Sequence, residues 1–435
     1  MTETQLVAGS RSQPGPGRPS RLSAGTPGQA TGETPTGESE ATATSPSGRL
    51  AQLGPDPSMV QILTPQGLWH DHPDYPIELS PDQLRDALEK MVMARRLDLE
   101  GTNLQRHGEL ALWPPLRGQE ATQAGAYLAV GHLDQIFPTY REQGLVHWMG
   151  VSLPEILATW RASAICPWDT VATRCSAYPV MIGSSALHGV GYAMGIQRDG
   201  MTGHVETSGD LDTSQDAAVM LFHGDGSMSQ GDVNEAYVFA AANNAPIVFC
   251  CINNQYAISE PTSLIARAPL FSRAAGFGIR SVQVDGNDIV AMAAVMREAM
   301  RRARAGEGPT FVEAFTYRMG AHTTTDDPTR YRTRAEEEHW AALDPISRLQ
   351  SYLLDAGEID RGWLAALDQR AEAFGAEVRA AIGQIPEPDL VAELGNVYVD
   401  STPEILAQQQ ELTEWLAADS DLPEASASTD GETRR

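Results

Sequence analysis

The sequence predicts an α/β protein with a doubly wound, mainly parallel sheet that carries helices on both faces. Two continuous apolar runs, residues 218–222 and 246–252, are typical of buried parallel strands. Strand-like residues 281–284 and 310–315 follow, and helix-like residues 288–304 lie between them. This alternation of strands and helices indicates a parallel sheet built from βαβ units.

Two helix starts are indicated by capping patterns. Ser80 precedes a helical stripe of apolar residues, and Gln83 follows it by three positions, as in a capping box. Between the two apolar runs, Asp232 and Glu235 form a second pair of this kind, for a helix that runs to about Ala242. Both patterns mark where a helix is expected to begin, and the second helix lies between two predicted strands.

Composition divides the chain into four predicted segments. Residues 1–57 hold eight prolines and nine glycines, which is typical of a disordered tail. Residues 58–343 form the α/β domain, and residues 344–417 form a C-terminal helical region. Residues 418–435 are polar and acidic, which predicts a flexible tail.

The charge and the cysteines limit the class of protein. The formal net charge is −26, with 57 acidic and 31 basic residues, which argues against binding to nucleic acid or to an anionic membrane. No apolar run is long enough for a transmembrane helix, and the N-terminus lacks a signal-peptide core. Neither zinc nor thioredoxin-like chemistry is expected, because no Cys-x-x-Cys pair is present, and a reducing cytoplasm fits. The four cysteines are Cys166, Cys175, Cys250 and Cys251.

Polar residues follow each of the first two apolar runs. Gly224-Asp225-Gly226 comes after the first run, and Asn253-Asn254 comes after the second, with Asn254 29 residues after Asp225. That spacing is about one βαβ unit, so both side chains are expected at the same edge of the sheet. Carboxylate and amide oxygens suit Mg²⁺, and glycine lets a diphosphate approach the backbone. Each motif alone is usually a turn, but together they favour a metal-diphosphate site.

The two motifs together resemble the thiamine diphosphate motif. The wider sequence, from about Leu79 to Leu412, resembles the alpha subunit of the decarboxylase component of pyruvate and branched-chain 2-oxo acid dehydrogenases. The matching segments occur in order at residues 117–121, 140–142, 253–259, 284–288 and 316–323.

This resemblance implies roles for individual residues. Asp225 and Asn254 would be Mg²⁺ ligands, with the backbone carbonyl of Tyr256 as a third. Gly226 would lie against the diphosphate of the cofactor.

The resemblance also implies contacts to the rest of the cofactor. Tyr140 and Arg141 would meet thiamine diphosphate, with the arginine on a phosphate because its planar fork pairs two oxygens. His322 would lie near the diphosphate and the reacting centre, and we expect it to be the catalytic residue. The backbones of Val180 and Ile182 would hold the aminopyrimidine.

Some positions depart from the family pattern. Branched-chain relatives have a phosphate-binding arginine where this chain has Ile252. Ser184 and Ser185 replace the threonine and glutamine that bind K⁺ in some relatives, which weakens a K⁺ site. The loop at Thr323, Thr324 and Thr325 resembles one that is phosphorylated in some relatives, but phosphorylation is not expected here, because Asp326 and Asp327 would repel a phosphate.

Four other polar residues are expected to have structural roles. His223 is expected to be structural, and His188 to be a satisfied buried histidine rather than a cofactor contact. Glu120 is expected to make structural hydrogen bonds. Arg318 is expected to order the loop of His322.

The implied function is thiamine-diphosphate-dependent oxidative decarboxylation of a 2-oxo acid, with acyl transfer to a lipoyl group of an acyltransferase component. The cofactor supplies the chemistry, and the protein supplies binding and electrostatics. The resemblance implies a beta subunit, in a heterotetramer of two alpha and two beta chains, without which the lone chain would be inactive. Pyruvate and branched-chain substrates stay open. The alternatives are an acetoin dehydrogenase alpha subunit and a non-catalytic assembly subunit of the same fold.

Overall fold

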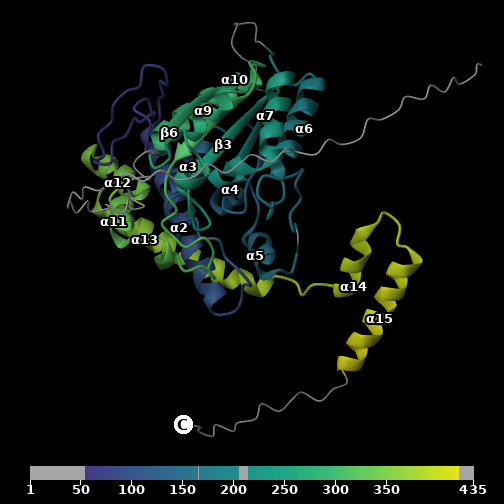
Figure 1. Cartoon of the computed structure of the whole chain (residues 1–435). Coiled ribbons are helices and arrows are strands. Elements are labelled where there is room, and N and C mark those ends of the chain that lie inside the picture. The colour runs from purple at the N-terminus through teal and green to yellow at the C-terminus, as the bar shows by residue number, and fades with distance from the viewer. Residues whose placement is uncertain (1–53, 165, 205–213, 421–435) are drawn as a thin grey trace, which may run out of the picture. The chain divides into compact units, whose positions relative to one another are not determined.

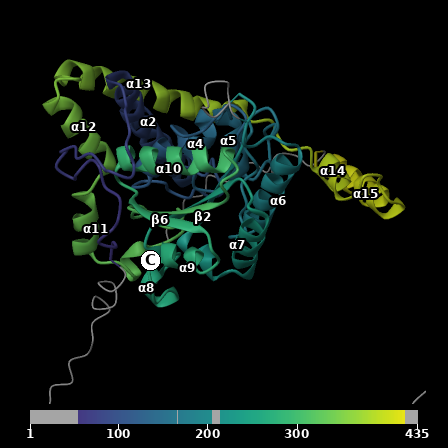
Figure 2. The same cartoon turned by 90° about the horizontal axis from the view of Figure 1, so that it is seen from above.

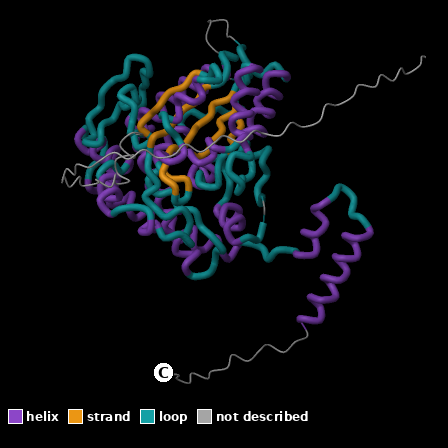
Figure 3. The backbone as a smooth tube through the Cα atoms, in the orientation of Figure 1, coloured by secondary structure: helices purple, strands orange, loops and turns teal. Residues whose placement is uncertain are grey.

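The computed structural model describes residues 54–164, 166–204 and 214–420. The predicted N-terminal tail lies outside the described residues up to position 53, and the predicted C-terminal tail does so from position 421. Within the described part of the chain, helices surround a central sheet (Figure 1, Figure 3). No helix of these residues is both long and apolar enough to cross a membrane.

The central sheet is parallel throughout, as predicted. Its five strands, in spatial order, are β1 (Gln135–Phe137), β2 (Val219–Gly224), β3 (Ile247–Asn253), β7 (Thr310–Phe315) and β6 (Arg280–Asp285). The short strand β1 was not predicted, because three residues carry too little periodicity to be recognised. The other four strands coincide with the predicted strand segments to within two residues.

The apolar runs of β2 and β3 serve two separate cores, because successive side chains of a strand point to opposite faces. Met220 and Val248 join the core on one face, whereas Leu221 and Ile247 join the core on the other. The adjacent thiols divide in the same way, with Cys250 in the first core and Cys251 in the second. The prediction that these cysteines are core residues is therefore confirmed.

Helices cover both faces of the sheet, as Figure 2 shows. One face carries α10 (Ile289–Arg304), and behind it α3 (Glu120–Tyr127) and α2 (Pro81–Arg106). The opposite face carries α6 (Ser185–Arg198), α7 (Gly231–Asn243) and α9 (Leu270–Ala275). The predicted doubly wound architecture is thereby confirmed.

The capping patterns had different outcomes. At α2 the hydroxyl of Ser80 accepts the N–H of Gln83 at 3.2 Å, and the Gln83 side chain accepts the N–H of Ser80 at 2.9 Å. The predicted cap of α7 was wrong, since that helix begins at Gly231 after an N-cap that makes no side-chain hydrogen bond. Asp232 instead lies inside the first turn, where its carboxylate meets the positive end of the helix.

The remaining elements connect and extend these layers. Before the C-terminal region they are α4 (Gln143–Trp148), α5 (Leu153–Arg161), the 3₁₀ turn η2 (Asp225–Ser229), β4 (Tyr256–Ala257), β5 (Glu260–Pro261), α8 (Thr262–Ile265), η3 (Pro328–Arg330) and α11 (Arg334–Ala341). The C-terminal region is helical, as predicted, and holds α12 (Pro345–Asp355), α13 (Arg361–Ala381), η4 (Ile382–Gln384), α14 (Leu390–Glu393), η5 (Leu394–Val397) and α15 (Pro403–Ser420).

The helices α12 and α13 belong to the same core as the sheet. Leu349 and Leu353 of α12 and Leu367 of α13 join the cluster that contains α2 and α10. The predicted boundary at residue 344 stays a prediction. The helix α15 runs to Ser420, so regular structure extends into the predicted acidic tail.

Candidate active site

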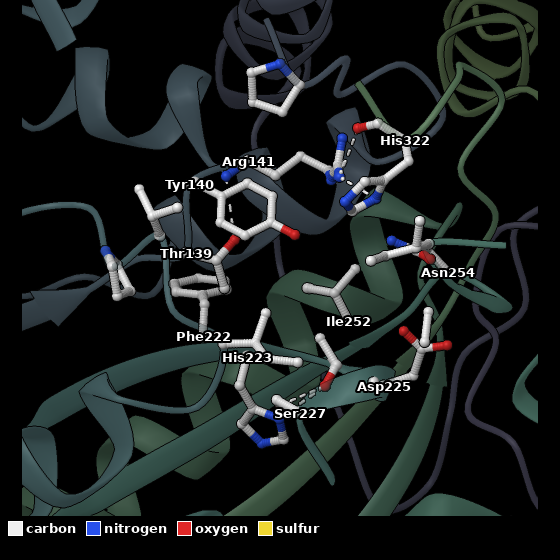
Figure 4. Close-up of a pocket in the computed structure, with 18 of the residues that line it drawn as sticks. Thr139, Tyr140, Arg141, Phe222, His223, Asp225, Ser227, Ile252, Asn254 and His322 are labelled. Carbon is white, nitrogen blue, oxygen red and sulfur yellow. Dashed lines mark hydrogen bonds between the residues drawn. The ribbon is translucent and has the colours of Figure 1, made fainter. Parts of the chain in front are cut away.

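A cavity of about 540 Å³ lies at the carboxyl ends of β2 and β3 (Figure 4). Ligands of doubly wound sheets bind at this edge, and the volume is in the range of small-molecule sites. The structure brings all the sequence-predicted site residues to its wall. They are Tyr140, Arg141, Val180, Ile182, Asp225, Gly226, Asn254, Tyr256 and His322.

The strand register explains why Asp225 and Asn254 meet there. Gly224, the last residue of β2, lies opposite Ile252 of β3, so both polar residues follow neighbouring strand ends. Both side chains are buried, with 2% of Asp225 and 7% of Asn254 exposed. Figure 4 shows both on the same side of the cavity. They are therefore positioned to act on one ligand.

The environment of Asp225 is closed but polar. Burial raises the pKa of its carboxyl group, while hydrogen bonds from the Thr262 hydroxyl and the Gly226 N–H act in the opposite direction. The Thr262 hydroxyl donates to the Asp225 Oδ2 atom at 2.5 Å. Thr262 was not predicted, because it lies 37 residues beyond Asp225 and belongs to no motif.

The predicted magnesium site stays a prediction. Among the described residues, no three His, Cys, Asp or Glu side chains gather as a metal cluster. The predicted ligand set holds one carboxylate, one amide and one backbone carbonyl. That carbonyl, of Tyr256, accepts Arg318 Nη1 at 3.1 Å, and a carbonyl oxygen has a second lone pair.

Close packing accounts for the glycine at position 226. A Cβ atom there would lie 2.8 Å from the Cβ of Ala257, in the hairpin formed by β4 and β5. Gln255 and Ile258, at the two ends of β4, have φ angles of 73° and 58°. These left-handed conformations turn the chain back over the end of β2.

Arg141 and His322 line another part of the cavity wall. The Arg141 guanidinium is buried and donates to the carbonyl oxygens of Pro115, at 2.6 Å, and His322, at 3.1 Å. Its Nη2 atom also lies 3.3 Å from His322 Nδ1. Because that nitrogen can only accept from an arginine, the neutral ring carries its proton on Nε2. The Tyr140 ring meets the imidazole edge-on, with centroids 6.3 Å apart.

The charge state of His322 follows from these neighbours. Burial, followed by the positive charges of Arg141 and Arg318, lowers the pKa of His322 to about 3. The backbone N–H of His322 donates to Asp326 at 2.8 Å, which fixes the loop. The structure therefore holds this imidazole neutral at physiological pH.

The segment expected to meet the aminopyrimidine lies at the mouth of the cavity. Val180, Met181 and Ile182 expose 74%, 74% and 43% of their surfaces. Ser184 donates to the carbonyl of Met181 at 2.8 Å, and Ser185 is buried. The predicted K⁺ site stays a prediction.

The expectation that His188 is buried was wrong. This residue is exposed on α6, and its ring nitrogen lies 2.9 Å from the carbonyl oxygen of Ser184. The next two residues of the helix, Gly189 and Val190, are the buried ones, so the side chain of His188 points away from the core. It does not line the cavity.

The other polar residues have hydrogen-bonded surroundings. His223 is buried and contacts the hydroxyls of Ser227, at 3.0 Å, and Tyr237, at 3.2 Å, and burial lowers its pKa to about 4. Glu120 is buried and forms an ion pair with Arg95 at 2.7 Å.

Several residues of the cavity wall were not predicted from the sequence, and two of them have unpaired polar atoms. Gln119 and Trp160 line the cavity, and each has a buried side-chain nitrogen, Nε2 and Nε1, that finds no hydrogen-bond partner among the described residues. Gln119 lies inside the motif at residues 117–121. That motif supported the family resemblance, but it did not show that the Gln119 side chain faces the cavity.

Comparison with known proteins supports the resemblance found in the sequence. The family described as "Dehydrogenase E1 component" matches residues 89–387. The chain is 42% identical over 373 residues to the 3-methyl-2-oxobutanoate dehydrogenase subunit alpha of Mycobacterium tuberculosis (strain CDC 1551 / Oshkosh), which covers 86% of this chain and 97% of that protein. It is 34% identical over 358 residues to the pyruvate dehydrogenase E1 component subunit alpha of Staphylococcus aureus (strain Mu50 / ATCC 700699), covering 81% of this chain and 92% of that protein.

Proposed function

The chain belongs to the family of dehydrogenase E1 components, and we propose that it is the thiamine-diphosphate-binding alpha subunit of a branched-chain 2-oxo acid dehydrogenase. The reaction is the oxidative decarboxylation of a 2-oxo acid, with acyl transfer to a lipoyl group of the acyltransferase component. The greater identity to a 3-methyl-2-oxobutanoate dehydrogenase subunit, 42% against 34% for a pyruvate dehydrogenase subunit, supports the branched-chain substrate.

The charges of the cavity support a diphosphate with its metal ion. The hydrogen bonds of the Arg141 guanidinium go to uncharged acceptors, two carbonyl oxygens and the His322 ring nitrogen, so its positive charge is available for a phosphate. Asp225 and Asn254, with the Tyr256 carbonyl, would hold Mg²⁺. Gly226 would lie against the diphosphate, and the backbones of Val180 and Ile182 would hold the aminopyrimidine. Thiamine diphosphate supplies the electron sink for decarboxylation when it is bound.

The chain's own contribution to the reaction is assigned to His322. Its Nδ1 atom faces Arg141, so Nε2 carries the proton of the neutral ring and is available as a donor. The Tyr140 ring and the buried Arg141 keep the imidazole in place. A bound phosphate would offset the arginine charge and raise the pKa of His322, which would favour proton transfer near neutral pH.

An apolar rim supports the need for a beta subunit. Val180, Met181, Ile182 and Ile258 stand exposed beside the buried cavity, with 58% of Ile258 accessible. Exposed apolar groups that gather at a site mark a contact with another protein. The proposed assembly is a heterotetramer of two alpha and two beta chains, which passes the acyl group to a lipoylated acyltransferase.

The substrate is tested with the reconstituted alpha–beta pair. We expect a kcat/KM for 3-methyl-2-oxobutanoate at least tenfold above that for pyruvate, and no turnover of acetoin, in a lipoyl-dependent assay. A pyruvate preference would replace the branched-chain assignment, and acetoin turnover would replace the oxo acid class.

A binding measurement separates an enzyme from a non-catalytic assembly subunit. Thiamine diphosphate at about 100 times its Kd should stabilise a binding protein by about 2.7 kcal/mol, and the melting temperature should rise accordingly when Mg²⁺ is present. Asp225→Ala is the matched variant, and its melting temperature should not respond. If the melting temperature of the wild-type alpha–beta pair did not rise with thiamine diphosphate and Mg²⁺, the enzyme assignment would be contradicted.

A further inference from the structure

The Thr262 hydroxyl makes a short hydrogen bond to the carboxylate of Asp225. Thr262 is 3% exposed, and its Oγ1 atom lies 2.5 Å from Asp225 Oδ2 and 3.3 Å from Asn253 Oδ1. A hydroxyl has one proton to donate. The nearer acceptor also carries the charge, so the proton points to Asp225.

Glu313 fixes the orientation of the Asn253 side chain that lies beside Thr262. The Asn253 amide nitrogen donates to Glu313 Oε1 at 2.6 Å, which turns its oxygen towards Thr262. The other Glu313 oxygen accepts the backbone N–H of Phe271 at 2.8 Å. The buried hydrogen bonds that start at Glu313 of β7 therefore end at Asn253 of β3, and the single proton of the Thr262 hydroxyl is donated to Asp225.

The hairpin of β4 and β5 brings Thr262 to this place. Tyr256 pairs with Pro261, and Ala257 pairs with Glu260, so the chain reverses directly after the predicted ligands. The N–H of Thr262 then donates to the carbonyl of Gln255 at 3.0 Å. Both the backbone and the hydroxyl of Thr262 are held, which makes the contact to Asp225 a rigid one.

We propose that Thr262 is a positioning residue that fixes the Asp225 carboxylate for a divalent cation, an inference that rests on the proposed cofactor site. The hydroxyl on Oδ2 would hold the carboxylate in one orientation, in which its remaining lone pairs can meet a cation. Groups that orient metal ligands in this way typically account for a 10- to 100-fold difference in affinity. If the hydroxyl only provided a hydrogen bond to a buried carboxylate, its removal would lower the stability of the protein but would not change its affinity for the metal ion.

The test measures Mn²⁺ binding by electron paramagnetic resonance in the reconstituted alpha–beta pair with thiamine diphosphate. Thr262→Val removes the hydroxyl and keeps the shape, and it should weaken Mn²⁺ binding about tenfold or more. Thr262→Ser keeps the donor and should stay within about threefold of the wild type. In the activity assay, excess metal should restore the kcat of the valine variant, because the defect lies in binding.

Thr310→Val is the matched control. Thr310 is a buried threonine of β7 whose hydroxyl has no hydrogen-bond partner within the described part of the chain, so its removal should leave Mn²⁺ binding unchanged. Wild-type affinity in Thr262→Val would overturn the proposal, as would an equal loss in Thr310→Val. If Thr262→Val did not assemble, Thr262→Cys, with its weak thiol donor, would be judged by the same criterion. Absence of Mn²⁺ binding by the wild-type pair would instead overturn the cofactor site itself.

Discussion

A histidine that is held neutral beside two arginines makes the site sensitive to pH. The pKa of His322 falls from an ordinary value of about 6.5 in an unfolded chain to about 3 in the folded one. Below about pH 6.5 the unfolded chain therefore binds a proton that the folded chain does not. Stability is unaffected above that pH and decreases as the pH falls towards 3.

This difference predicts a measurable effect of His322→Gln in the cofactor-free protein. Between about pH 8 and about pH 5.5, His322 should lower the free energy of unfolding of the wild type by about 1 kcal/mol, allowing for its partial exposure, and the variant should lack that loss. Urea unfolding at both pH values measures it. His188→Gln, at the exposed histidine of α6, is the control and should keep the wild-type pH dependence.

The same His322→Gln variant tests the catalytic role. In the assembled enzyme it should lower lipoyl-dependent turnover about 10²- to 10⁴-fold, which is the usual contribution of general acid–base catalysis. Thiamine diphosphate should still bind. Normal turnover by the variant would remove His322 from the proposed reaction.

The sequence predicted which polar residues meet but not how they are held. Asp225 and Asn254 follow buried strands directly, so local pattern and parallel topology together place them at one edge. Thr262 reaches Asp225 only because Gln255 and Ile258 adopt left-handed conformations, and their side chains give no signal for that. Contacts that depend on such reversals could not be predicted from spacing.

At the scale of elements, the hairpin of β4 and β5 closes over the end of β2 and leaves no room at Gly226. Gly226→Ala would place a methyl group 2.8 Å from the Cβ of Ala257. Such overpacking typically costs about 1–3 kcal/mol, and it should also displace the hairpin and weaken thiamine diphosphate binding. Urea unfolding and a cofactor titration measure the two effects.

The control for this substitution is Gly231→Ala at the start of α7. A Cβ atom at Gly231 would meet no atom of another described residue within 4 Å, and alanine is favourable in a helix by about 1 kcal/mol relative to glycine. This variant should be as stable as the wild type or slightly more stable, with unchanged cofactor binding. A Gly226→Ala protein that behaved in the same way would show that the hairpin yields to the methyl group.

Strands and helices were predictable where burial gave them a clear pattern. The segment 310–315 is predicted with the bounds that β7 has in the structure, because all six residues are buried. The position of β7 between β3 and β6 was not predictable, because strand order depends on how the crossover helix α10 packs and not on local sequence. The predicted cap of α7 was wrong for a related reason. The 3₁₀ turn η2 leads directly into the helix, and the N-cap residue makes no side-chain hydrogen bond.

At the scale of the whole molecule, the cavity is incomplete as a reaction chamber. Its inner wall is charged and buried, whereas its mouth is formed by apolar side chains that face solvent, among them Val180 and Met181, each 74% exposed. Water would reach a cofactor through such a mouth, and exposed apolar groups are unfavourable unless another surface covers them. Both facts favour a beta subunit on this face.

The purified lone chain is therefore expected to show no 2-oxo acid-dependent acyl transfer. Adding the beta subunit should restore it in proportion to the alpha–beta complex that forms, because closure of the mouth excludes water and completes the site. Light scattering coupled to size exclusion measures the complex, and the lipoyl-dependent assay measures turnover in the same fractions. The beta subunit alone is the control. Turnover in fractions that contain only the alpha chain would show that the cavity is already a complete active site, and the apolar rim would then need another partner to account for it.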